Sequence, residues 1–427
     1  MRAVRARAPV RVPAPAPGGP TPHRHWQVIA HTGHPVAAPL GARGAGPGAA
    51  PVTTTDPAPP APPATATAVL LGTEFHPGDN GLLLRGIAEA RRHRRRLVLV
   101  HLGAGGTSLV RAAMEEDRTL RALSIELPER PSPPAVRTAV ALARTERTGP
   151  EEIQVDQSGR ITTTRWCDVD LPAAPPARGD LPAVVITGGL GGLGIRAATV
   201  LSDLHHMHPV LIDRRRPAAL DRTARRYLRR LAGSPTGVSV RTADLTDARQ
   251  VSAALAGVPA PVCAVIHCAG VLRGGTLARH RAEDLACDQA VKVAGLRNLV
   301  GALDPSALRH LVVFGSVLAE WRPHHLGSYA LANELLWRAV LRMSGGLPVT
   351  ATVVAQWAVW AGAGMAHELG VVRQAERIGM APIPLGPGLA ALRRLLAWPS
   401  GPGRAARLIL TAGGDGDKES GNGNSKS

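Results

Sequence analysis

Short apolar runs recur through the second half of this 427-residue chain, and longer stretches with helical spacing separate them. The runs lie at residues 183–186, 210–212, 238–240, 262–266, 311–314 and 349–354. The helix-like stretches lie at residues 195–207, 222–232, 248–256, 282–303 and 329–343, and two further helical pieces are expected within 356–398. Strands alternating with helices predict parallel βαβ units. Because the runs are continuously apolar, we expect an α/β fold with a doubly wound parallel sheet, covered by helices on both faces.

The first part of the chain carries a weaker form of the same pattern. Apolar runs at 68–71, 97–102 and 123–127 alternate with helix-like stretches at 82–90, 108–116 and 135–147. Residues 153–166 have alternating arms around a D-Q-S-G turn, which predicts a hairpin. We therefore expect a reduced α/β unit over residues 24–170. The GAGG string at 103–106 lacks the further glycine of a dinucleotide fingerprint, so a tight turn is the preferred interpretation.

Composition marks the boundaries of these units. Residues 1–23 are rich in arginine, proline and alanine and lack the apolar core of a secretory signal, so we expect a disordered leader. A proline-rich linker at 171–180 precedes the second unit, residues 181–412. Residues 413–427 are polar and glycine-rich, which predicts a disordered tail.

The formal charge of +18 raises the hypothesis of nucleic-acid binding. No zinc spacing, RNA-binding signature or basic strip with aromatic residues accompanies the charge, so an arginine-biased composition explains it better. The four cysteines form no C-x-x-C pair, which favours free thiols in a reducing cytosol over a metal site. The uncharged segment 344–366 is long enough to cross a membrane, but its proline, glutamine and β-branched residues favour a buried strand and loop. We therefore expect a cytoplasmic protein without metal, nucleic acid or membrane.

A glycine-rich segment follows the first strand of the second unit and opens a helix. It consists of Thr187, Gly188, Gly189, Leu190, Gly191, Gly192, Leu193 and Gly194. Glycines let the backbone approach a pyrophosphate, and the N–H groups at the start of the helix then meet the negative charge. Asp213 lies nineteen positions after Gly194, just after the second strand, as a dinucleotide fingerprint requires. The sequence therefore predicts a dinucleotide cofactor.

The residues around Asp213 leave the phosphate state of that cofactor open. Asp213 could bind a ribose 2′-hydroxyl, which favours NAD, whereas Arg214 and Arg215 could hold a 2′-phosphate, which favours NADP. The two arginines could equally be solvated surface residues. After the third and fourth strands, further cofactor contacts are expected from Asp244 and Leu245 and from the small residues Ala269 and Gly270, while His267 is interpreted as a packed residue.

Tyr329 is one of only two tyrosines in the chain. Ser316 lies thirteen residues before it, and Asn333 lies four residues after it. Positions i and i+4 share a face of a helix, so Tyr329 and Asn333 are expected to point the same way. A phenol held beside a hydroxyl and an amide is a candidate proton donor.

These strings together resemble a known family. VVITGGLGGLG, ADLTD, VIHCAGVLRGGTL, VKVAGLRNL, FGS and SYALANELL are similar, in this order, to segments of short-chain dehydrogenase/reductases, and most closely to the ketoreductase domains of modular polyketide synthases. Residues 24–170 resemble, more weakly, the truncated structural subdomain that precedes the catalytic one in those ketoreductases. The resemblance implies a Rossmann-type sheet preceded by a smaller, truncated Rossmann-like subdomain.

The resemblance also implies an activity. It points to reduction of a β-ketoacyl thioester on an acyl carrier protein by NADPH, with NADH not excluded, and to other synthase components as partners. Tyr329 matches the family's proton donor, Ser316 and Asn333 its hydrogen-bonding partners, and Lys292 a lysine that could lower the pKa of the tyrosine. Ordinary short-chain reductases carry that lysine four residues after the tyrosine, where this chain has Asn333.

Two residues bear on the stereochemistry. In the family, a tryptophan eight residues before the tyrosine accompanies L-hydroxy products, and Trp321 lies there. The Leu-Asp-Asp string of D-hydroxy enzymes is replaced by residues 272–274, LRG, and Leu326 stands where histidine or glutamine is common. An L-hydroxy product is therefore expected. A catalytically silent docking module and a reductase of a small free ketone remain as alternatives.

Overall fold

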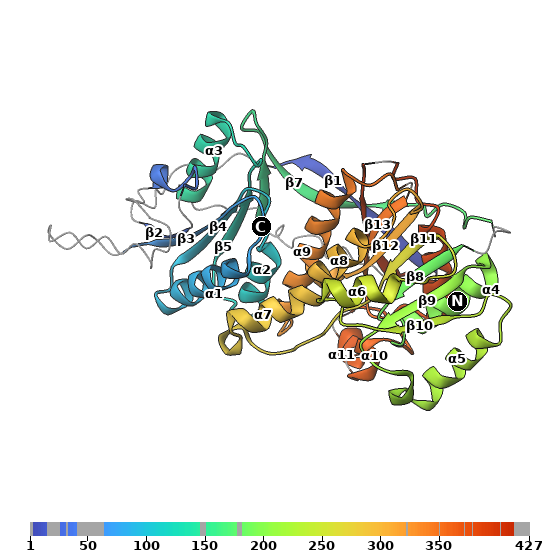
Figure 1. Ribbon diagram of the computed structural model, residues 1–427. Helices are drawn as coiled ribbons and strands as arrows, with labels where there is room; N and C mark the ends of the chain where they lie inside the picture. The colour runs from blue at the N-terminus through green and yellow to red at the C-terminus, as the bar shows by residue number, and fades with distance from the viewer. Residues whose placement is uncertain are drawn as a thin grey trace.

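The computed structural model describes residues 3–14, 26–30, 33–40, 64–145, 151–176, 182–321, 323–349, 351–370, 372–377, 379–401 and 403–413. The strands of these residues form one continuous fourteen-stranded sheet (Figure 1). The order is β10-β9-β8-β11-β12-β13-β14-β1-β7-β6-β5-β4-β3-β2. The described strands within residues 182–413 and within residues 26–169 therefore build opposite ends of the same sheet.

The second half forms the doubly wound part. Its strands are β8 (Ala183–Thr187), β9 (His208–Asp213), β10 (Ser239–Thr242), β11 (Val262–His267), β12 (His310–Ser316), β13 (Ala351–Trp357) and β14 (Ala406–Ala412). Each neighbouring pair is parallel. The strand order reverses between β8 and β11, and ligands of such sheets bind beyond the carboxyl ends of the strands at that point. The predicted α/β doubly wound fold is confirmed.

Helices cover both faces of this part of the sheet. They are α4 (Gly194–His205), α5 (Arg222–Ala232), α6 (Ala248–Leu255), α7 (Ala282–Gln289), α8 (Gly295–Gly301), α9 (Gly327–Ser344), α10 (Met365–Glu368), α11 (Val372–Arg377) and α12 (Leu385–Leu395). The helix expected at 282–303 is divided by a π-helical turn, Ala290–Ala294. Three pieces, rather than the two expected, lie within 356–398 among the described residues. No helix in the described ranges is long and apolar enough to cross a membrane.

The first half repeats the scheme with fewer elements. Its strands are β2 (Trp26–Ala30), β3 (Ala66–Leu71), β4 (Arg96–His101), β5 (Ala122–Glu126), β6 (Glu152–Val155) and β7 (Ile161–Val169), and its helices are α1 (Pro77–Arg92), α2 (Thr107–Glu116) and α3 (Pro133–Arg144). Strands β2 to β6 are parallel, and β6 and β7 form the predicted antiparallel hairpin. The domain boundaries at 24–170 and 181–412 stay predictions.

Within the expected disordered leader at 1–23, the described residues 3–14 instead contain a strand, while residues 1–2 and 15–23 lie outside the described part of the chain. Strand β1 (Val4–Pro13) lies in the middle of the sheet and pairs antiparallel with β14 on one side and β7 on the other, so it joins the two halves. Strand β1 pairs with β14 only through residues 4–7. Pro9 lies beyond this pairing, where β7 is the one neighbour of β1, so the missing N–H of proline is tolerated. Only Ala6 of this strand is buried, so no apolar run marked it. The expected tail lies outside the described residues from 414 onward.

Candidate active site

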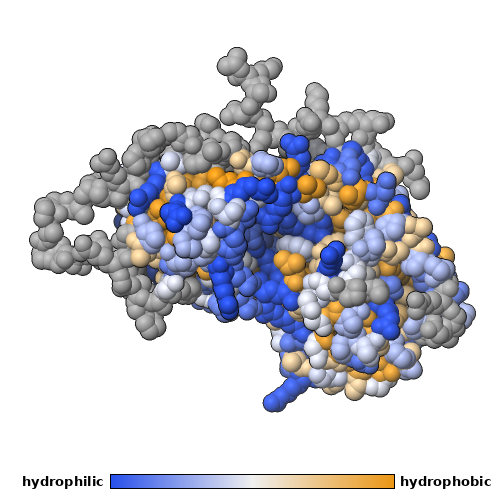
Figure 2. Space-filling view, turned by 90° about the horizontal axis from the view of Figure 1, so that it is seen from above, coloured by the Kyte–Doolittle hydropathy of each residue, from blue (hydrophilic) through white to orange (hydrophobic). Residues whose placement is uncertain are grey.

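The predicted site residues gather beyond the carboxyl ends of β8, β11 and β12, beside the start of α9. Helix α9 runs between the two lobes of the molecule (Figure 1). In the view from above, hydrophilic side chains fill the hollow where the lobes meet (Figure 2). Among the described residues, no group of three or more His, Cys, Asp or Glu side chains could hold a metal ion.

The glycine-rich turn after β8 has the close packing that a phosphate-binding loop needs. Gly188 has a φ of +64°, which favours glycine. A methyl group on Gly189 would lie 2.7 Å from the Ile186 carbonyl, and one on Gly194 would overlap the Gly188 carbonyl. Side chains at these positions would clash with the backbone of the turn, so glycine permits the tight strand-to-helix turn that a pyrophosphate at the start of α4 would need.

Asp213, at the end of β9, is almost fully buried and already engaged by its own surroundings. Its carboxylate accepts hydrogen bonds from the Leu190 N–H at 3.1 Å and from the backbone and side chain of Arg215 at 3.0 to 3.2 Å. Asp213 therefore braces the glycine-rich turn and orients Arg215, whose side chain is half exposed. Arg214 is exposed beside it. This arrangement leaves the arginines more available to a cofactor than the carboxylate.

A chain of buried polar groups connects the cofactor turn to Lys292. The Ala269 N–H donates to Thr187 Oγ1 at 3.3 Å, and Thr187 Oγ1 lies 2.8 Å from His267 Nδ1. His267 Nε2 lies 3.1 Å from the Lys292 carbonyl oxygen, which can only accept, so the proton is on Nε2. Burial, aided by the charge of Lys292, lowers the pKa of His267 to about 3, and the neutral ring is a structural connector.

Lys292 occupies the π-helical turn, a type of distortion that is frequent at functional sites. Its side chain is buried, and its Nζ donates to the Phe314 carbonyl at 3.0 Å. The same Nζ lies 5.7 Å from the centre of the Tyr329 ring. A methyl group on Gly270 would lie 3.2 Å from Nζ, so glycine there leaves room for the lysine. Burial lowers the pKa of Lys292 to about 8.

Tyr329, Ser316 and Asn333 lie together, as their spacing predicted. Burial raises the pKa of Tyr329 above its ordinary value, and hydrogen bonds with Asn333 and Ser316 act in the opposite direction. Burial dominates, and Lys292 is not among the groups that shift this pKa, so its predicted effect on Tyr329 stays a prediction. The Asn333 Nδ2 donates to the Tyr329 carbonyl at 2.8 Å, while its buried Oδ1 has no hydrogen-bond partner among the described residues. That oxygen could accept a bond from a water molecule or a ligand.

A second group of residues orients Ser316. The Ser316 N–H donates to the buried Gln356 Oε1 at 3.2 Å, and the Gln356 Nε2 donates to Glu320 at 3.3 Å. Arg407, on β14, donates to the same Glu320 carboxylate at 2.6 Å. Ser316 Oγ accepts from the Leu318 N–H at 3.3 Å, which leaves its own proton to be donated elsewhere.

Helix α10 lies over both parts of the site. A methyl group on Gly192 would lie 2.8 Å from the Gly364 N and 3.1 Å from the Glu368 carboxylate, so this segment rests on the cofactor turn. A methyl group on Gly270 would lie 3.8 Å from Met365 Cε, which places Met365 near the lysine pocket. No motif in the sequence of this segment had indicated these contacts.

The other predicted residues have more local environments. Asp244 is exposed and accepts from the N–H and hydroxyl of Thr246, while Leu245 is buried in the apolar core beneath. Trp321 packs partly buried against the core of the second half. Leu326 immediately precedes α9, and a methyl group on Gly274 would lie 3.9 Å from it.

Sequence reasoning missed the supporting residues rather than the central ones. Gln356 and Glu320 support Ser316, and Glu334 and Arg338 extend from α9 toward the first half. The one available signal was the Glu334–Arg338 pair at i and i+4, directly after Asn333.

Regions similar to this chain occur in known polyketide synthases. Residues 182–362 match the family model described as "KR domain". The chain is 34% identical over 262 residues to "Polyketide synthase GfsA" of Streptomyces halstedii, which covers 60% of this chain and 3% of that protein. It is 32% identical over 249 residues to "Pikromycin polyketide synthase component PikAIII" of Streptomyces venezuelae. That match covers 56% of this chain and 15% of the relative. The chain thus spans a small part of the length of these curated relatives.

A solved structure shares the whole architecture. The ketoreductase "PlmKR1" from the first module of phoslactomycin biosynthesis in Streptomyces sp. HK803 matches with a TM-score of 0.75 at 23% identity. The match covers 97% of this chain and 94% of that one, so both halves of the sheet are shared. The family match and the relatives thus support a polyketide synthase ketoreductase domain over residues 182–362.

Proposed function

We propose that this protein uses NADPH to reduce a β-ketoacyl thioester, a polyketide intermediate on an acyl carrier protein, to the β-hydroxyacyl product, with Tyr329 as proton donor. The observation that carries the proposal is the convergence of four side chains at the sheet's switch point. Ser316 from β12, Asn333 from α9 and Lys292 from the π-helical turn lie around the buried phenol of Tyr329.

The proposed roles follow from the charge that develops during reduction. NADPH, when bound, supplies a hydride to the ketone carbon. The ketone oxygen then becomes negative, and Tyr329 gives it a proton while Ser316 donates a hydrogen bond to it. Because burial raises the pKa of Tyr329 above its ordinary value, the phenol is protonated at neutral pH and has a proton to give. Lys292 provides a positive charge near the phenol, and the unpartnered Asn333 Oδ1 could hold a water that returns the proton.

The glycine-rich turn would bind the pyrophosphate, and Arg214 and Arg215 would bind the ribose 2′-phosphate. The engagement of Asp213 by Leu190 and Arg215 supports NADPH over NADH, because a carboxylate with all these donors has little capacity left for a ribose hydroxyl. Ala269 and Gly270 would leave space for the nicotinamide end.

The proposed product is the L-hydroxy epimer, on the ground of the resemblance that Trp321 carries. Arg273 stands where a Leu-Asp-Asp string has its first aspartate. Its side chain forms an ion pair with Asp288 at 3.2 Å. The acyl carrier protein, the other synthase components and a cytoplasmic location are parts of the same proposal.

The test is an assay of purified protein with a simple β-ketoacyl thioester, following nicotinamide absorbance and separating the product epimers. We expect activity with NADPH, an L-hydroxy product and loss of activity in Tyr329→Phe with cofactor binding retained. Activity no higher in the wild type than in Tyr329→Phe would overturn the proposed reaction. Calorimetry that detects no binding of NADPH or NADH would favour a silent docking module, and activity only on free ketones would favour the small-ketone alternative.

A further inference from the structure

The catalytic helix α9 is shared between the two halves of the protein. Leu331 and Leu335 pack in the apolar core of the first half. Leu336 and Val340 pack in a core of the second half. The position of Tyr329, near the start of this helix, therefore depends on contacts with both halves.

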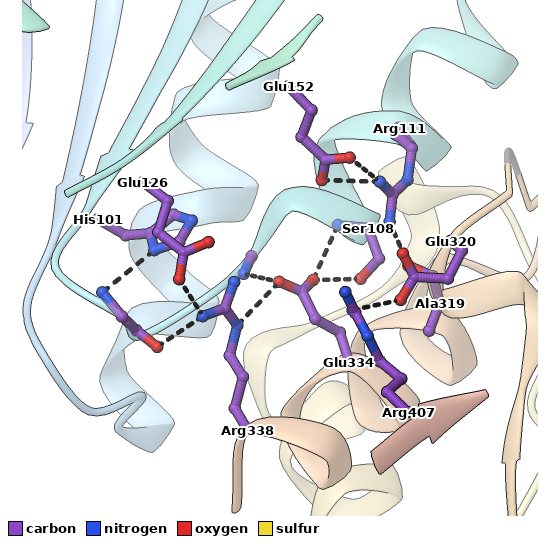
Figure 3. A network of polar contacts seen from close by, with 12 residues as sticks. His101, Ser108, Arg111, Glu126, Glu152, Ala319, Glu320, Glu334, Arg338 and Arg407 are labelled. Carbon is purple, nitrogen blue, oxygen red and sulfur yellow. Dashed lines mark hydrogen bonds and ion pairs between the residues drawn. The ribbon is translucent and has the colours of Figure 1, made fainter. Parts of the chain in front are cut away.

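Glu334, the residue after Asn333, makes the most concentrated polar contact between α9 and the first half (Figure 3). Its carboxylate accepts from the Gly106 N–H at 3.1 Å, the Ser108 N–H at 2.9 Å and the Ser108 hydroxyl at 2.7 Å. It also accepts from Arg338 Nε, one turn further along α9, at 3.3 Å. The side chain is only 6% exposed, so all four donors act in a dry environment.

The turn that receives this carboxylate is the GAGG string between β4 and α2. Gly103, Gly105 and Gly106 have φ values of +109°, +100° and +108°, a conformation that favours glycine. A methyl group on Gly105 would lie 2.8 Å from Glu334 Oε1 and 2.7 Å from Arg338 Nε. The turn therefore lets the backbone approach an anion at the N-terminus of the ten-residue helix α2.

The charges around Glu334 are balanced for an ionised carboxylate. Burial opposes ionisation most strongly, but Arg338 and the Ser108 hydroxyl outweigh it and hold the pKa of Glu334 below its ordinary value. Arg338 in turn donates to Glu126 at 2.9 Å and to the Gly103 carbonyl at 3.0 Å. The contact thus includes side chains and backbone from the GAGG turn, β5 and α2.

We propose that Glu334 is a positioning residue: its carboxylate is the built-in ligand of the anion site at Gly103–Gly106 and α2, and this contact sets α9 so that Tyr329 and Asn333 meet Ser316 and Lys292. The first half then contributes to reduction without touching the substrate. In this respect the inference rests on the proposed function.

The test compares Glu334→Gln and Glu334→Ala with a matched control, Glu116→Gln. Glu116 also has a side chain 6% exposed and also joins the halves, through the Leu277 N–H at 3.0 Å, but the partners described for its carboxylate are Leu277 and Arg91 rather than residues of α9. We expect Glu334→Gln to lower kcat about 10- to 100-fold with an unchanged KM, because small displacements of catalytic groups have such effects. Glu116→Gln is expected to retain kcat. Added formate is expected to restore part of kcat in Glu334→Ala by occupying the vacated anion site.

Two outcomes would overturn the proposal: an unchanged kcat in Glu334→Gln, or equal losses of kcat in Glu334→Gln and Glu116→Gln. If Glu334→Ala does not fold, Ser108→Ala removes one donor from the same carboxylate and is expected to lower kcat in the same direction.

A readout independent of activity separates this inference from the proposed reaction. In a Tyr227→Phe background, Tyr329 is the single tyrosine, so its ionisation can be followed by near-ultraviolet absorbance. We expect Glu334→Gln to raise the pKa of Tyr329, because displacement of α9 relative to β12 weakens the Ser316 hydrogen bond that lowers it. Loss of a nearby negative charge alone would lower that pKa. An unchanged or lowered pKa would contradict the positioning role even if the wild type reduces no thioester.

Discussion

The His267 ring joins the glycine-rich turn to Lys292, because its Nε2 donates to the Lys292 carbonyl at 3.1 Å. The other ring nitrogen lies 2.8 Å from Thr187 Oγ1, at the start of the glycine-rich turn. A single neutral side chain thus ties β8, β11 and the π-helical turn. Protonation of His267 would place a second donor against the Thr187 hydroxyl and a second cation beside Lys292.

Acid is therefore expected to destabilise the fold through buried histidines. The pKa of His267 is lowered to about 3, and those of His101 and His34 to about 4, mainly by burial. Since each folded-state pKa lies below the ordinary value of 6.5, the stability they contribute is complete above pH 6.5 and is lost as pH falls toward 4. In that window, each such histidine lowers the free energy of unfolding by about 1 kcal/mol for each unit by which pH falls.

Urea unfolding measured from pH 7 to pH 4 checks this expectation. In His267→Gln, which cannot take up the proton, the free energy of unfolding should fall less steeply with acid than in the wild type. The control is His206→Asn, an exposed position with a φ of +51° that asparagine tolerates, and its slope should match the wild type. Equal slopes in wild type and His267→Gln would contradict the assignment.

The rate of reduction is expected to fall as pH rises through about 8. Burial lowers the pKa of Lys292 to that value, so the lysine loses its positive charge there. The charge lies 5.7 Å from the Tyr329 ring, and its loss disfavours any build-up of negative charge on the phenol during proton transfer. In pH profiles of kcat, Lys292→Met should be slower at pH 7 and should lack this alkaline limb. A limb that persists unchanged in Lys292→Met would assign it to another group.

Selectivity for NADPH over NADH is expected to depend on Arg215. Its guanidinium donates to Asp213 at 3.2 Å. The guanidinium also lies beside the glycine-rich turn, because a methyl group built on Gly191 would be 3.5 Å from it. A hydrogen bond from Arg215 to the charged 2′-phosphate would contribute to the binding free energy of NADPH and not of NADH. Arg215→Ala should therefore reduce the NADPH-to-NADH ratio of kcat/KM by about 10- to 100-fold. Arg222→Ala, an exposed arginine at the start of α5, is the control and should leave the ratio unchanged. If Arg215→Ala also retains the ratio, the 2′-phosphate is bound elsewhere.

The elements whose residues carry their own local signal could be predicted from sequence. Continuous apolar runs marked β8 and β12, and the thirteen-residue and four-residue spacings around Tyr329 placed Ser316 and Asn333 at one site. Strand β1 could not be found this way, because only Ala6 is buried and its stability comes from pairing with β14 and β7, which are distant in sequence. Glu334 escaped for the same reason: a glutamate on a helix has the appearance of a solvated residue until the partner at Ser108 is known.

Glu368 is expected to weaken cofactor binding. Its carboxylate lies 3.1 Å from the position of a methyl group on Gly192, in the turn proposed to hold the pyrophosphate, and its charge acts on Arg215. The Glu368 carboxylate and a pyrophosphate bound in this turn would both be negative and would repel each other, although exposure of Glu368 to water screens the repulsion. Glu368→Gln should therefore lower the dissociation constant of NADPH by a few fold, and more at low salt than at high salt. Calorimetric titrations at two ionic strengths measure this, with exposed Glu376→Gln on α11 as the control. Weaker binding in Glu368→Gln would instead mean that α10 swings away and that the carboxylate assists closure over the bound cofactor.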